Sequence, residues 1–191
     1  VYEHGFVWDE IPSALSAVDG KTQNHTARVN LNPYPDRYGK LVHGFLYERD
    51  GRIRYANKWN NKGQIGWSLR DWSAFHIHLT EDQGIGMNLL PDTAGIYRFW
   101  SPVAGRLRYR CTVRGDAQVP VRVCIMKGRE ELFAGTCEAG QELSAELELQ
   151  TALRDRIDLI VKASGVSRAT VTLYPKVEKC PERKVSDEVP H

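Results

Sequence analysis

Three of the five tryptophans in this 191-residue chain lie within residues 59 to 72 (WNNKGQIGWSLRDW), among Asn, Gly, Lys and Gln. A core strand would supply Val, Ile and Leu, so this composition predicts a loop. Indole and phenol faces pack against the C–H patches of sugar rings, while amide, guanidinium and imidazole groups bond to sugar hydroxyls. The segment and its flanks supply both kinds of group, in Tyr55, Asn57, Trp59, Trp67, Arg70, Trp72, His76 and His78.

Exposure of the tryptophans decides between two interpretations. If they face solvent, they form an aromatic platform; if they lie under the loop, they close one end of the fold, and the chain is a structural spacer or adhesion domain. In the alternating run WSAFHIHLTE, Trp72 shares a strand face with His76 and His78, which makes it the strongest candidate for exposure. The opposite face of this run is expected to meet the core through Phe75, Ile77 and Leu79.

Catalytic alternatives depend on the same segment. His76 and His78 lie about 7 Å apart on one strand face, and Glu81 follows, which resembles the first half of a cupin metal motif. The second half of that motif, with a third His, is absent. A polysaccharide lyase would use Tyr55, Arg70 and His76. We expect a noncatalytic role, with no metal or other cofactor except a calcium ion that braces a loop.

Arg106, Arg108 and Arg110 alternate along one strand face. Guanidinium groups match the carboxylates or sulfates of an acidic polysaccharide. Glu146 and Glu148 alternate in the same way further along the chain, and cross-strand pairs with the arginines would neutralise both sets. We favour this structural interpretation.

Charge and length exclude several classes of partner. The 26 Lys and Arg nearly balance the 24 Asp and Glu, for a formal net charge of +2, so no field favours nucleic acid or an anionic membrane. No apolar run approaches the roughly 20 residues that cross a bilayer, and the start lacks the features of a signal peptide. Because it begins at Val1, we expect a piece of a larger multidomain chain. The four cysteines form no CxxC pair, and their pairing stays open.

Period-2 alternation from about residue 94 onward predicts the fold. Apolar positions alternate with polar ones in GRLRYRCTVR, VPVRVCIMKG, LSAELELQ, RIDLIVKA and ATVTLYP. This pattern predicts an all-β protein, an antiparallel β-sandwich of the jelly-roll type. A hairpin is expected across Asp50-Gly51, and a short helix near Ala14. We expect one domain over residues 1–178, with an irregular extension over about 1–40, followed by a linker or tail over 179–191.

The runs IYRFWSPVAGRLRYRCTVRG, VPVRVCIMKGREELF and LRDRIDLIVKASG carry a resemblance over about residues 94 to 177. Their aromatic strand, the turn from Pro102 to Gly105 and the acidic turn before the last of these strands resemble bacterial carbohydrate-binding-module-like jelly rolls. Such accessory domains accompany secreted polysaccharide-degrading enzymes. One position departs from the pattern, because Arg154-Asp155 stands where these domains often have Gly-Asp.

The resemblance implies a secreted or cell-surface domain that binds a polysaccharide or oligosaccharide without catalysis. Two other hypotheses remain: an enzyme on the same scaffold, cupin-like or lyase, and a structural spacer.

Overall fold

The computed structural model describes residues 34–35, 41–56, 58–60, 66–68, 76–80, 82, 84–101 and 103–180. These residues form two antiparallel sheets of seven strands each and no helix, which confirms the predicted β-sandwich. In this part of the chain, therefore, no helix is long and apolar enough to cross a membrane. The short helix expected near Ala14 and most of the expected tail lie outside the described residues.

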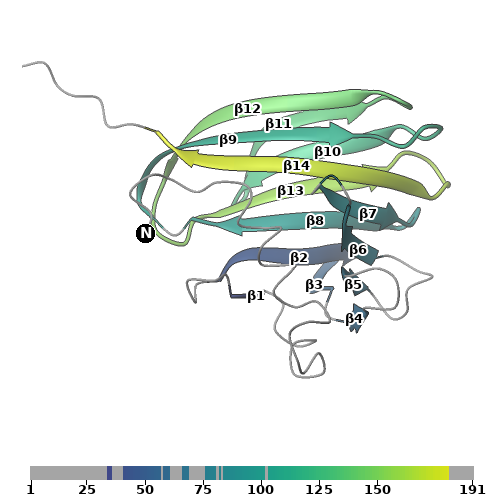
Figure 1. Ribbon diagram of the computed structural model, residues 1–191, viewed down its shortest axis with the longest axis horizontal. Helices are drawn as coiled ribbons and strands as arrows, with labels where there is room; N and C mark the ends of the chain where they lie inside the picture. The colour runs from purple at the N-terminus through teal and green to yellow at the C-terminus, as the bar shows by residue number, and fades with distance from the viewer. Residues whose placement is uncertain are drawn as a thin grey trace, which may run out of the picture.

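The two sheets, A and B, lie face to face (Figure 1). Sheet A has the order β1 (Tyr34–Pro35), β2 (Leu41–Arg49), β8 (Thr93–Trp100), β13 (Arg156–Ala163), β10 (Val121–Lys127) and β11 (Glu130–Cys137), with β3 (Arg52–Tyr55) also paired to β2. Sheet B has the order β12 (Glu142–Thr151), β9 (Gly105–Arg114), β14 (Ala169–Lys179), β7 (Ile85–Leu89), β6 (His76–Leu79), β5 (Gly66–Ser68) and β4 (Lys58–Asn60).

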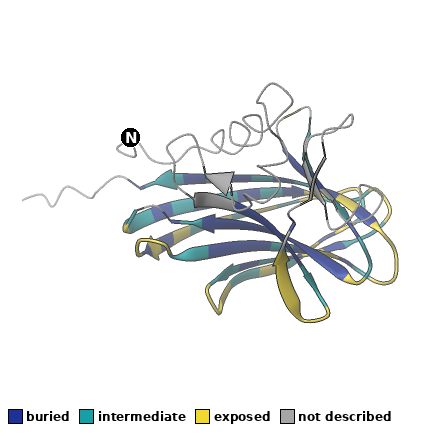
Figure 2. Cartoon of the chain, turned by 90° about the horizontal axis from the view of Figure 1, so that it is seen from below, coloured by how far each residue is buried: buried dark blue, intermediate teal, exposed yellow. Residues whose placement is uncertain are grey.

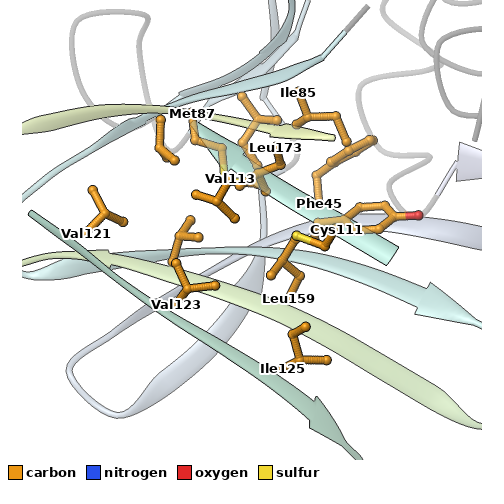
Figure 3. Packing of buried hydrophobic residues seen from close by; sticks show 14 of the residues in the cluster. Phe45, Ile85, Met87, Cys111, Val113, Val121, Val123, Ile125, Leu159 and Leu173 are labelled. Carbon is orange, nitrogen blue, oxygen red and sulfur yellow. The ribbon is translucent and has the colours of Figure 1, made fainter. Parts of the chain in front are cut away.

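The core lies between the sheets and follows the predicted alternation. The inward residues of β9 are at most 3 % exposed: Leu107, Tyr109, Cys111 and Val113. Val123 and Leu159 of sheet A project toward Val113 and Leu173 of sheet B (Figure 3). Ile77, predicted to face the core, is fully buried. Removal of these side chains from water is the main stabilising contribution to the sandwich.

Burial weakens at the edge of sheet B. Strand β12 pairs with β9 alone, and its inward Leu143, Ala145 and Leu147 are partly buried. An edge strand has a neighbour on one side only, so its inward face is less covered. Other exposed residues lie at turns that join strands and within strands, as at Arg52, Ile53 and Arg54 of β3 (Figure 2).

The turn between β2 and β3 shows how local sequence fixes strand pairing. The predicted hairpin across Asp50-Gly51 joins β2 to β3, with Arg49 opposite Arg52. Asp50 and Gly51 have φ angles of 53° and 70°, as the tight turns of twisted hairpins require.

Arg154 also has a positive φ, 71°. Its N–H donates to the Ser101 carbonyl at 2.7 Å, and its guanidinium lies 5.5 Å from the Trp100 ring centroid. Arg154 thus adopts the left-handed conformation that glycine favours.

An ion pair joins β8 to β13 on the side of sheet A opposite the core. Arg98 donates to both carboxylate oxygens of Asp158, at 2.7 and 2.8 Å, and the two side chains are 9 % and 5 % exposed. Both hydrogen bonds of the fork are made, so the two buried charges are compensated.

The segment predicted as a loop instead contains strands. Residues 58–60 and 66–68 form β4 and β5, which pair with Trp59 opposite Trp67. The prediction was wrong here because each strand has three residues, too few for an alternating pattern to emerge among Asn, Gly and Gln.

The last strand of sheet B extends nearly to the end of the described residues, and none of the four cysteines forms a disulfide. β14 continues to Lys179, and the Cys180 N–H donates to the Arg106 carbonyl at 2.9 Å. All four cysteines are free thiols.

Candidate functional site

The outer face of sheet B carries regular rows of polar side chains. Alternate residues of β9 point away from the core, and the strand pairings align them with outward residues of β12 and β14. One row is Ser144, Thr112 and Tyr174; the next is Glu146, Arg110 and Lys176. Cross-strand partners share a face, so these side chains are direct neighbours.

A hollow of about 440 Å³ opens in this face. Its lining consists of Arg110, Cys111, Thr112, Ser144, Ala145, Glu146, Tyr174 and Lys176. Two short side chains explain its position: the Thr112 and Ser144 hydroxyls lie 2.9 Å apart, and long Arg and Glu side chains flank them on both sides. The outer face of sheet B is therefore hollowed where the Thr112 and Ser144 side chains stand next to each other on β9 and β12.

Tyr174 forms one wall of the hollow and is fixed from several directions. Its hydroxyl donates to Asp82 Oδ2 at 2.6 Å, and the Arg114 guanidinium lies 5.1 Å from its ring centroid. A Cβ on Gly84 would lie 2.7 Å from Tyr174 Cε1, so glycine at 84 leaves the space that the ring occupies. Burial, then the bond to Asp82, raises the pKa of Tyr174 to about 12. At neutral pH the phenol is a hydrogen-bond donor, not an anion.

Asp82 is the acceptor at the centre of this network. Hydrogen bonds from the Thr80 hydroxyl, at 2.6 Å, and from Tyr174 lower its pKa from 3.8 to about 2. Arg114 lies 3.2 Å from the same carboxylate. The turn between β6 and β7 is thereby fastened to β14 and β9.

The charged rows confirm the favoured interpretation of the arginines. Each outward arginine of β9 contacts a carboxylate on a neighbouring strand. The contacts are Arg106 to Glu148 at 2.6 Å, Arg108 to Glu146 and Glu148 at 3.4 Å each, Arg110 to Glu178, and Arg114 to Glu142 at 3.0 Å. These arginines are therefore engaged in pairing within sheet B.

The predicted site residues fall in different places. Tyr55 belongs to β3 of sheet A, whereas Trp59, Trp67, His76 and His78 belong to β4, β5 and β6 of sheet B. The structure thus separates Tyr55 from the others by sheet. Three further predicted residues lie outside the described residues: Asn57, Arg70 and Trp72.

The pairing of β4 to β7 sets the backbone register of the segment that contains Trp59 and Trp67. Trp59 is opposite Trp67, Trp67 is opposite Ile77, and Ile77 is opposite Met87. Ile77 and Met87 are fully buried.

His78 lies on the outer face. A Cβ on Gly86 would lie 2.5 Å from His78 Nε2, so the imidazole rests across β7 where glycine provides the space. Among the described residues, no group of three or more His, Cys, Asp or Glu is placed to hold a metal. The metal site predicted as an alternative consists of His76, His78 and Glu81. Because Glu81 lies outside the described residues, this prediction is not tested.

Sequence reasoning missed most of the lining of the hollow. The sequence pattern singles out Arg110 as a candidate ligand for acidic sugars, but it does not single out Tyr174, Lys176, Thr112 or Ser144. One signal was present: Thr112 and Ser144 each interrupt a run of charged residues on the outward face. The hollow could not be predicted from this signal alone, because the sequence does not show that Thr112 and Ser144 are cross-strand partners.

No family model matches the sequence, and no curated protein matches it either. Among solved structures, a CBM4 carbohydrate-binding module is 9 % identical, with 87 % of this chain and 96 % of that chain covered and a TM-score of 0.43. A CBM61 module in complex with β-1,4-galactotriose is 13 % identical, with 58 % and 85 % covered and a TM-score of 0.40.

A third similar structure is the pre-peptidase C-terminal domain of a collagenase from Bacillus anthracis, 15 % identical, with 49 % and 87 % covered and a TM-score of 0.40. These likenesses concern the fold alone. Other solved structures similar to the chain are also carbohydrate-binding modules.

Proposed function

We propose that this chain is a noncatalytic carbohydrate-binding module that holds a polysaccharide on the outer face of sheet B. The observation that carries the proposal is the hollow, where hydroxyl, guanidinium, ammonium and carboxylate groups surround one tyrosine ring. Sugar hydroxyls both donate and accept hydrogen bonds, and this lining offers partners of both kinds. The hollow is open to solvent, so a long polymer can cross it.

The residues predicted from the sequence join this proposal as further candidate contacts. His78 lies on the same outer face, separated from β14 by β7. The other residues predicted from the sequence stay candidate contacts beside His78: Tyr55, Asn57, Trp59, Trp67, Arg70, Trp72 and His76. A secreted or cell-surface location within a larger chain fits this function.

The test is affinity gel electrophoresis of the purified chain on a panel of soluble polysaccharides, followed by calorimetry with the best ligand. Tyr174→Ala removes the aromatic wall, and we expect affinity to fall about ten-fold, or about 1.4 kcal/mol. Ser144→Ala removes one hydroxyl, and we expect a smaller loss. Thr136→Ala, on exposed β11 of sheet A, is the matched control and should bind as the parent does.

Three results can be told apart. Loss of affinity in Tyr174→Ala, with a smaller loss in Ser144→Ala and a parent-like far-UV circular dichroism spectrum in both variants, supports the proposal. Unchanged binding in both hollow variants moves the site to the segment from Tyr55 to His78. Failure of the parent to bind any glycan contradicts carbohydrate binding and favours the structural spacer.

A further inference from the structure

Charge balance across the hollow indicates which class of polysaccharide it accepts. The outward positions of β9 and β14 carry five cations: Arg106, Arg108, Arg110, Arg114 and Lys176. The outward positions of β12 and β14, with Asp82, carry five anions: Asp82, Glu142, Glu146, Glu148 and Glu178. Five positive and five negative charges sum to zero over these described positions.

The opposite charges are also paired in individual contacts. Each of the five cations has a carboxylate oxygen within 3.4 Å. In the lining of the hollow, Arg110 and Lys176 are the two cations, and both contact Glu178, with Lys176 Nζ 2.9 Å from Glu178 Oε1. These contacts also lower the pKa of Glu178, so it stays ionised beside them.

An anionic sugar would meet two obstacles here. Its carboxylate or sulfate would compete with Glu178 for Arg110 and Lys176, and it would approach Glu146, which also lines the hollow. A neutral hydroxyl meets neither obstacle, because it can donate to Glu146 and accept from Lys176 while the ion pairs stay formed.

Resting on the proposed function, we infer that the polymer bound in the hollow is neutral and that Glu178 excludes uronate and sulfated chains. Glu178 is then a specificity-determining residue, because it satisfies the two cations that would otherwise attract an anionic polymer.

The experiment compares matched neutral and anionic polymers by affinity gel electrophoresis of the parent chain. The pairs are hydroxyethylcellulose with carboxymethylcellulose, arabinoxylan with glucuronoxylan, and galactan with polygalacturonate. We expect binding to the neutral member of at least one pair to be about ten-fold tighter than to its anionic partner. Tighter binding of the anionic member overturns the inference and leaves carbohydrate binding intact, whereas binding to none of the six overturns the proposed function itself.

Glu178→Gln tests the cause of the preference. The variant leaves Arg110 and Lys176 without their shared carboxylate, so we expect affinity for the anionic polymer to rise about ten-fold and to fall again with added salt. Glu130→Gln removes the same charge from β11 of sheet A and should produce no gain. No gain in Glu178→Gln either would overturn the assignment of specificity to Glu178.

Discussion

At the scale of single residues, small side chains determine the shape of the outer face of sheet B as much as functional groups do. Gly84 and Gly86 leave space for the Tyr174 ring and the His78 imidazole, and the short Thr112 and Ser144 create the hollow. Side chains of ordinary size at these positions would fill the outer face of sheet B. Candidate ligand contacts therefore depend on small neighbours that carry no chemistry of their own.

Arg154 allows a test of backbone conformation. Because its φ is 71°, we expect Arg154→Ala to be less stable than Arg154→Gly by about 1 kcal/mol, although glycine is the more flexible residue. Both variants lose the stacking on Trp100, so the difference between them isolates the backbone effect. Urea denaturation measures it, and equal stability of the two variants would contradict a left-handed conformation at this position.

At the scale of elements, alternation was predictable and register was not. The inward residues of β9 and β10 follow from period-2 patterns, because the core accepts only apolar side chains over that length. Which residue of β12 stands opposite Thr112 depends on pairing between strands that lie 32 residues apart in sequence, and no local pattern encodes it. For this reason the fold class could be predicted while the hollow could not.

Asp82, in the turn between β6 and β7, is expected to make the stability of the protein depend on pH in acid. The folded-state pKa of Asp82 is about 2, below the ordinary 3.8, so its contribution to the free energy of unfolding is complete above pH 3.8 and is lost as the pH falls toward 2. Asp82→Asn removes this contribution. We expect the variant to be less stable than the parent at neutral pH and the gap to narrow between pH 4 and about 2.

Denaturant unfolding at a series of pH values measures this dependence. Tyr174→Phe keeps the ring but removes one hydrogen bond to Asp82, so it should show a smaller acid dependence than the parent. A constant gap between parent and Asp82→Asn across this range would contradict the network.

At the scale of the whole molecule, the core is closed by packing and not by covalent links. Its largest fully buried side chains come from both sheets, Tyr97 and Phe99 from β8 and Tyr109 from β9. Cys111, Cys137 and Cys180 are buried, and Cys124 is partly exposed beside Glu131. Burial raises the pKa of the Cys111 thiol to about 12, which suppresses the reactive thiolate.

We therefore expect four titratable thiols after denaturation and at most one, Cys124, that reacts rapidly in the native protein. Burial and Glu131 raise the pKa of Cys124, so even this reaction should be slower than that of a free cysteine. Dithionitrobenzoate titration with and without guanidinium measures both numbers. Cys124→Ser should abolish the native reaction, and fewer than four thiols in the denatured, unreduced chain would reveal a disulfide.

The rows on sheet B also bear on how the chain avoids misfolding. A slip of β12 against β9 by two residues would keep every apolar side chain inward, so the core alone does not penalise it. In either direction, however, the slip would set Ser144 opposite an arginine, Arg110 or Arg114, and a glutamate opposite Thr112. Thr112 and Ser144, the two residues that open the hollow, therefore stand opposite each other in the native alignment and in neither of these slipped ones.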